Sequence, residues 1–151
     1  MQRIGIAHWR PAARLRSWGL APLHREGNTV FVPCDATEAL WLGAWLEERV
    51  NTAHVRLGNP RDGASGSISL PPDGQLTALD DQLHGPQPLA LVAPASDGTR
   101  PCHTLKLQLD CGTSSAAIEL VMLAPERWAS RSGRTPAAPR TTPPPRPPRL
   151  G

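Results

Sequence analysis

Residues 35–50, DATEALWLGAWLEERV, constrain the fold of this chain more than any other stretch, because they combine a helix-start signal with the two closest tryptophans. Asp35 and Glu38 stand three residues apart in the form of a capping box, in which each side chain bonds the backbone N–H of the other residue. Apolar residues then recur at the spacing that places side chains on one helix face. The pattern predicts a helix over residues 35–50, with an apolar face broad enough to need cover on more than one side.

Alternating apolar residues and turn residues predict short strands on both sides of this helix. Leucines alternate with polar residues over 104–110, and a turn at 112–115 leads into a second apolar alternation. The Glu-Gly-Asn sequence at 26–28 is typical of a hairpin turn. The predicted strands cover residues 3–8, 23–32 as a hairpin, 53–57, 67–70, 88–93, 104–110 and 116–123, and two shorter helices are predicted over residues 11–18 and 76–83.

These elements predict an α+β fold, a small two-layer domain over residues 1–128. The last three strands are expected to form an antiparallel meander, because the connections between them are short. The prediction is therefore a mixed or mostly antiparallel sheet whose apolar face is covered by one main helix over residues 36–50. Residues 129–151 are rich in proline and arginine and carry no periodic apolar set, so we expect a disordered tail that cannot offset its ordering entropy by burial.

Charge and motif content narrow the functional classes. The formal net charge is +3 and Lys106 is the only lysine, so the basic residues are nearly all arginines, several of them in the tail. No apolar run approaches the roughly 18 residues needed to span a bilayer, and the amino terminus lacks the apolar core of a signal peptide. We therefore expect a cytoplasmic protein with reduced thiols. The spacing of cysteines and histidines predicts no metal site, and no motif predicts a cofactor.

The tryptophans give the leading hypothesis, a non-catalytic protein-interaction module or small subunit of a larger assembly. Trp is enriched at binding hot spots, so Trp41 or Trp45 marks a partner surface if it faces outward and belongs to the core if it does not. Pro144, Pro147 and Arg149 belong to a P-x-x-P-x-R pattern that aromatic-lined grooves read as polyproline II. The tail would then act as a tether or second contact, or it is simply an unstructured end.

Nucleic-acid binding is the first alternative. It would use a basic first helix beside two tryptophans, together with arginines of the tail, and its affinity would fall steeply with salt. A solvated basic face with the tryptophans in the core explains the same pattern. The candidate residues are Arg10, Arg14, Arg16, Arg140 and Arg146.

A small cysteine-dependent enzyme is the second alternative. Cys34 precedes the predicted helix start, where a helix dipole would lower the pKa of a thiol, and His24 is the histidine that the hairpin would bring toward it. The competing interpretation is a buried cysteine that acts as a small apolar side chain. No local catalytic motif is present, so we expect no enzyme activity and a small-molecule substrate is not favoured.

Overall fold

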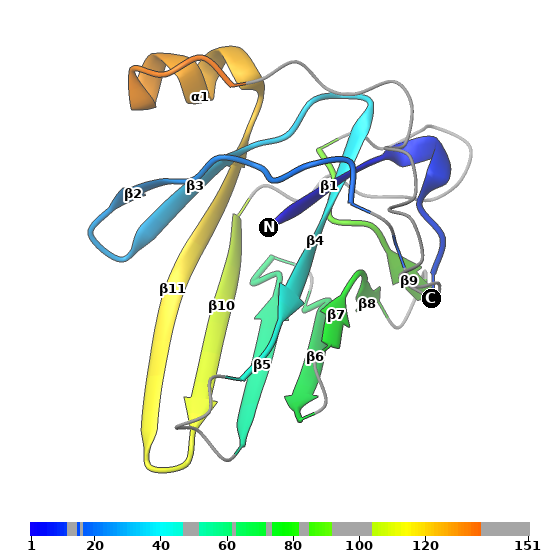
Figure 1. Cartoon of the computed structure of the whole chain (residues 1–151), viewed down its shortest axis with the longest axis vertical. Helices are drawn as coiled ribbons and strands as arrows, with labels where there is room; N and C mark the ends of the chain where they lie inside the picture. Colours follow the sequence, from blue (N-terminus) through cyan, green and yellow to red (C-terminus); the bar gives the residue numbers. More distant parts are fainter. Residues whose placement is uncertain are drawn as a thin grey trace, which may run out of the picture.

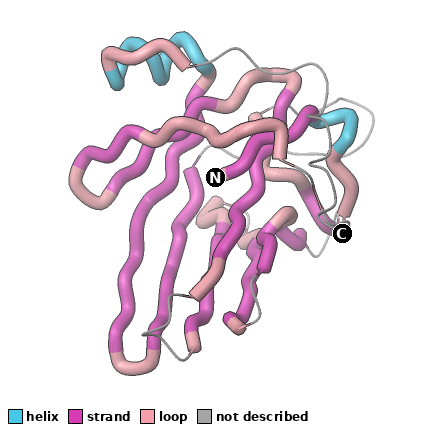
Figure 2. The backbone as a smooth tube through the Cα atoms, in the orientation of Figure 1, coloured by secondary structure: helices cyan, strands magenta, loops and turns pink. Residues whose placement is uncertain are grey.

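Strands make up most of the described chain, and they form two sheets that pack against each other (Figures 1 and 2). The structure is a computed structural model that describes residues 1–11, 15, 17–46, 52–61, 63–71, 74–81, 85–91 and 104–136. The strands are β1 (Gln2–Gly5), β2 (His24–Glu26), β3 (Thr29–Pro33), β4 (Glu38–Ala44), β5 (Ala53–Gly58), β6 (Ser65–Leu70), β7 (Gly74–Leu76), β8 (Leu79–Asp81), β9 (Gly85–Gln87), β10 (Thr104–Cys111) and β11 (Ser114–Leu123). Two helical elements accompany them, the short 3-10 helix η1 (Ile6–His8) and the α-helix α1 (Pro125–Ser132).

The larger sheet has eight strands in the order β2-β3-β11-β10-β5-β6-β8-β9, and the smaller sheet has the order β1-β4-β7. Among the described strand pairs only β3 and β11 run parallel, so the larger sheet is mixed. The predicted combination of strands with a helix is confirmed in this coarse form. The predicted mostly antiparallel sheet is confirmed in part, because only this one described pair is parallel. The predicted cover by one main helix is wrong, because the smaller sheet lies against the larger one in the place of that helix.

The half-buried strands were predicted correctly. β2 and β3 form the predicted hairpin, with Gly27 at φ 60° in its turn. β10 and β11 pair in antiparallel register around the predicted turn, from Thr104 opposite Val121 to Cys111 opposite Ser114. β5 and β6 also lie where alternation placed strands. The predicted meander is wrong in its third member, because the other neighbour of β10 is β5 and not residues 88–93.

The predicted central helix is wrong. Its start signal does form local bonds: Asp35 Oδ1 accepts the Thr37 N–H at 2.9 Å, and Glu38 Oε1 accepts the Asp35 N–H at 3.3 Å. These bonds close a turn, with the Glu38 N–H donating to Asp35 O at 3.0 Å, and the chain leaves that turn as strand β4. Glu38 then pairs with Arg3 of β1 at 2.6 Å inside the protein. Residues 47–51 of the predicted helix lie outside the described residues.

Burial on both faces explains why β4 resembled a helix. Ala39 and Trp41 point to one side and pack with Ile4, while Leu40 points to the other side into the main core. A strand that is covered on both faces has a nearly continuous apolar sequence, which periodicity alone does not separate from a buried helix. The deciding contacts are the pairings of β4 with β1 and β7, which are distant in sequence.

The shorter predicted helices and one predicted strand fail in similar ways. Leu76 and Leu79 share the main core, but they belong to separate strands, β7 of the small sheet and β8 of the large one. Over 88–93 the structure has a single bridge, Leu89 with Leu40, and residues 92–93 lie outside the described part. Of the helix predicted over 11–18, residues 12–14 and 16 are not described, and the described positions are not helical.

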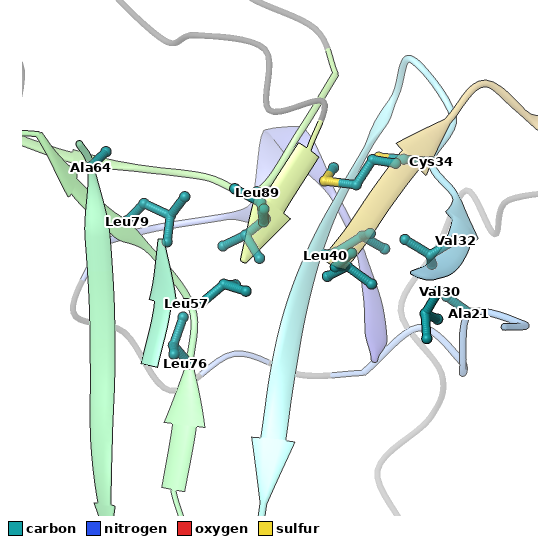
Figure 3. Close-up of a cluster of buried hydrophobic side chains, with 13 residues drawn as sticks. Ala21, Val30, Val32, Cys34, Leu40, Leu57, Ala64, Leu76, Leu79 and Leu89 are labelled. Atoms are coloured by element: carbon teal, nitrogen blue, oxygen red, sulfur yellow. The ribbon is translucent and has the colours of Figure 1, made fainter. Parts of the chain in front are cut away.

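The main core lies between the sheets. Figure 3 shows Leu40 of β4, Leu57 of β5 and Leu89 among its buried side chains. Each of these three leucines is fully buried. Burial of about 25 cal/mol per Å² of apolar surface makes such a cluster the main source of folding free energy.

Helix α1 packs against the outer face of the large sheet, where β3 and β11 end (Figure 1). Trp128 contacts Phe31 and Leu123 there, and its Nε1 donates to Phe31 O at 2.9 Å. The predicted tail began at residue 129, but α1 continues to Ser132. Residues 137–151 lie outside the described part of the chain.

Candidate functional site

An apolar hollow lies at the end of the molecule opposite α1. β4, β6 and β10 end there and β5 begins there, as the arrowheads in Figure 1 show. The register agrees, because Ala53 at the start of β5 pairs with Leu70 at the end of β6. The last inward side chains of several strands surround one hollow at this end.

This hollow, which we call the mouth, has a volume of about 330 Å³. Its described lining is aliphatic apart from one tryptophan and one thiol, and the indole N–H is the only side-chain nitrogen or oxygen among these residues. The lining residues are Leu42, Ala44, Trp45, Leu46, Ala53, Val55, Leu70, Leu107, Leu109 and Cys111.

Trp45 distinguishes the mouth from the rest of the surface. Its side chain is 70% exposed, whereas Trp41 is 7% exposed and Trp128 is 1% exposed. Leu109, from the end of β10, is 39% exposed beside it. A large exposed aromatic next to an apolar hollow is less common than a scattered exposed leucine, and such patches mark interaction surfaces.

The structure separates the two predicted partner-binding tryptophans. Trp41 packs with Trp18, Ile4 and Ala39 and belongs to the core, whereas Trp45, just beyond the end of β4, is at the surface. Both were expected on one helix, where they would have been stacked a turn apart. The other partner-binding candidates, Pro144, Pro147 and Arg149, lie outside the described residues.

The nucleic-acid candidates are described only at Arg10. Its side chain is exposed, and its guanidinium donates to Ala7 O at 2.9 Å and to Trp9 O at 2.7 Å. Trp9 donates from Nε1 to Thr77 O at 2.9 Å, so its indole is tied to the body of the protein. The remaining candidates, Arg14, Arg16, Arg140 and Arg146, lie outside the described residues.

Cys34 is placed in the interior. It is 1% exposed, and its Sγ lies 3.6 Å from Glu38 O as a thiol donor. The His24 ring instead contacts the Phe31 ring and lies 3.4 Å from Glu26. A thiol nucleophile must be reached by its substrate, so this placement lends the enzyme alternative no support.

A comparison of the chain with protein-family models, curated proteins and solved structures finds no match. Within the described residues, no group of three or more His, Cys, Asp or Glu side chains is placed to hold a metal ion. In the same part of the chain, no helix is both long and apolar enough to cross a membrane.

Sequence reasoning missed most of the mouth. Leu107 and Leu109 were predicted to face inward on their strand, but nothing indicated that the strand would extend past its cover. The available signal was the position of Leu109, three residues before the turn that begins at Gly112. An inward residue at a hairpin tip lies at the rim of a sheet. Its neighbours from β4 and β5 come from distant parts of the chain, which local patterns do not bring together.

Proposed function

We propose that the chain is a protein-interaction module that takes apolar side chains of a partner protein at the mouth. The observation that carries this proposal is the 70% exposure of Trp45 at the rim of an apolar hollow. Tryptophan supplies a large contact area with few rotatable bonds, and it is among the residues most enriched at binding hot spots. Removing this surface from water on docking is favourable in proportion to the apolar area.

The chemistry of the lining favours a protein partner over a small-molecule substrate. Sites for small polar ligands carry a few placed polar groups that fix the ligand's orientation. Among the described lining residues, only the indole N–H of Trp45 and the thiol of Cys111 have polar hydrogens. The mouth therefore suits leucine-like or phenylalanine-like anchors, whose position is set by the shape of a larger interface.

The proline-rich tail remains a proposed second contact. Pro144, Pro147 and Arg149 would engage an aromatic-lined groove of the same partner or tether the module to it, and linkage of two contacts raises apparent affinity by effective concentration. Removing the tail should leave α1 and Arg134 in place, so the shortened chain should end at Pro136 and not at residue 128. The loss of affinity on removing residues 137–151 then measures the tail's contribution.

Site-specific photo-crosslinking tests the proposal. Benzoylphenylalanine replaces Leu109, which lines the mouth, or His54, which is exposed on the other face of the neighbouring strand β5. Each full-length variant is produced in the cells that naturally make the protein and irradiated. We expect one discrete adduct with another protein from position 109, none at matching yield from position 54, and loss of the adduct when Trp45→Ser is added.

Three results would contradict the proposal. They are the absence of a discrete adduct at position 109 in a folded chain, equal adducts at both positions, and an adduct at 109 that persists unchanged with Trp45→Ser. An adduct between two copies of this chain would also overturn it, because the mouth would then be a self-association surface. Circular dichroism of each variant establishes that the fold is retained.

A further inference from the structure

We infer that a second hollow, on the outer face of the large sheet, binds a tetrahedral oxyanion such as a phosphate group. This anion site has a volume of about 200 Å³ and lies away from the mouth, so it is independent of the function proposed above. Its described lining contains two cations and no acid. The lining residues are Arg56, Gly58, Asn59, Pro60, Gly63, Ala64, Ser65, Lys106 and Gln108.

The strand register builds the floor of the anion site. Lys106 of β10 lies opposite Gly58 of β5, and Gln108 lies opposite Arg56. Directly opposite residues project to the same face, and so do residues two apart on one strand. Gly58 has no side chain at the centre of this group, and among the described residues a Cβ built there would have only Ala64 O, at 3.9 Å, within 4 Å. The space above Gly58 is therefore open between Arg56 and Lys106.

The loop after β5 forms the wall of the anion site and holds Asn59 rigidly. The Asn59 N–H donates to Ala64 O at 2.8 Å, its carbonyl accepts the Gly63 N–H at 2.9 Å, and its Oδ1 accepts the Arg61 N–H at 3.0 Å. These bonds close a compact turn whose geometry depends on the asparagine side chain. Asn59 is thus fixed by both its backbone and its side-chain oxygen.

The Asn59 amide supplies a donor that no described residue accepts. Asn59 is 7% exposed, and within the described residues its Nδ2 makes no hydrogen bond. The bond from Arg61 assigns Oδ1, so the opposite atom is the NH₂ group. The Nδ2 atom is not fully enclosed, so a ligand in the hollow can reach it. A hydrogen bond from this amide to an anion is stronger than one to a neutral acceptor.

The two cations are free to bind the same anion. Neither Arg56 nor Lys106 makes an ion pair with a described residue, and both are exposed toward solvent. Arg offers a planar fork that matches phosphate oxygens, and Lys offers a compact charge. Together with Asn59 Nδ2, they converge on one small volume from β5, β10 and the loop between β5 and β6.

Glu119 is the acid nearest to this arrangement in register. It lies opposite Lys106 on β11 and lines a different hollow on the far side of the lysine. No ion pair joins Glu119 to Lys106 in the structure. Its negative charge opposes anion binding through Lys106, so Glu119→Gln should tighten the binding of the anion.

Titration with inorganic phosphate tests the inference in the full chain, with ionic strength held constant by sodium chloride. Chemical shifts of the Asn59 side-chain amide and of the Gly58 and Gly63 backbone amides report binding. We expect saturable shifts at these groups in the wild-type chain. Arg56→Gln or Lys106→Gln should bind phosphate about tenfold more weakly, because each loses a charge-assisted hydrogen bond. Glu119→Gln should bind phosphate more tightly. Asn59→Asp keeps the acceptor for the Arg61 N–H while replacing the free donor by a charge, so it should abolish binding in a folded chain.

Arg61→Gln is the matched control. It removes the same charge from the same loop, but the Arg61 side chain does not line the anion site. An equal loss of phosphate affinity in Arg61→Gln and Arg56→Gln would show that only the net positive charge of the loop attracts the anion, and it would overturn the inference. The absence of saturable shifts at Asn59 would overturn it as well. A parallel titration with O-phosphoserine distinguishes the ligand's source: tighter binding than phosphate assigns the site to a phosphate monoester, and weaker binding assigns it to the free ion.

Discussion

The two ends of the molecule differ in the exposure of their tryptophans. At one end α1 presses Trp128 onto the outer face of β3 and β11, where its indole is 1% exposed and hydrogen-bonded to Phe31 O. At the other end Trp45 is 70% exposed beside the mouth. The same residue type therefore holds an element in place at one end and is left in water at the other. A protein that covers one aromatic and leaves the other uncovered has a surface whose apolar area is available to a partner.

The short length of α1 explains why Trp128 should dominate the covered end. A helix of eight residues is marginal in isolation, because nucleation is costly and few bonds repay it. Trp128 is the only buried residue of α1, and Gly133 ends the helix in the left-handed region at φ 72°. The remaining attachments, Arg131 with Glu26 and Arg134 with Leu23 O, are at the surface. Trp128 should thus carry most of the attachment free energy.

Trp128→Ala should have the largest effect on stability. Removing a fully buried tryptophan loses its transfer free energy and leaves a cavity, which together cost about 3–5 kcal/mol. Urea unfolding followed by circular dichroism measures the change in free energy. A loss below about 1 kcal/mol would mean that α1 is held by its surface contacts, and the contrast between the two ends would not stand.

Trp128→Phe separates the hydrogen bond of this residue from its packing. Phenylalanine retains an aromatic ring but lacks the N–H that Phe31 O accepts at 2.9 Å. A buried acceptor left without its donor costs about 1–3 kcal/mol. The same unfolding measurement should place this variant between wild type and Trp128→Ala. Equal stability of the Phe and wild-type chains would show that the hydrogen bond contributes nothing.

Some strands could be predicted from the sequence and others could not. β10 and β11 were evident because each alternates against one buried face. β4 was not, because Leu40 and Trp41 are buried on opposite faces and together imitate a helix stripe. The local sequence did indicate side-chain to backbone hydrogen bonds from Asp35 and Glu38. Such bonds can start a helix, but here they close a turn before a strand.

The candidate site was harder to predict than the fold for a physical reason. Trp45 was identified from its residue type, yet its exposure depends on where β4 ends relative to β5 and β10, which is a non-local fact. α1 was missed because a single tryptophan in a sequence rich in arginine and serine gives no periodic pattern. Nothing in the sequence around Asn59 indicates a fixed side chain, and only the bonds to its backbone and Oδ1 reveal one.

Trp45→Ala should change stability by less than about 0.5 kcal/mol, because exposed side chains contribute little to folding. The substitution should nevertheless remove the most strongly quenched part of the tryptophan fluorescence when acrylamide is added, since Trp18, Trp41 and Trp128 are buried and Trp9 is half-buried. Stern–Volmer quenching of wild type and variant gives the measurement. Unchanged quenching in the variant would show that Trp45 is inaccessible to acrylamide. The two ends of the molecule would then not differ in the exposure of their tryptophans.

The smallest predicted effect concerns Glu26, which the Arg131 guanidinium holds at the covered end. The hydrogen bond from Arg131 is the main reason that the pKa of Glu26 lies below its ordinary value of 4.5. A carboxyl whose pKa is lower in the folded state stabilises the fold above its unfolded pKa, and that contribution is lost as pH falls through the folded pKa. Unfolding of wild type and Glu26→Gln at a series of pH values should show a small difference in stability at neutral pH that disappears below pH 4.5.

Salt should also shrink this difference in stability, because the Glu26 and Arg131 side chains are largely exposed. At about 1 M salt, screening acts within a few ångströms. A difference that persists at low pH and high salt would assign Glu26 a role other than its charge, and α1 would then be held by more than Trp128.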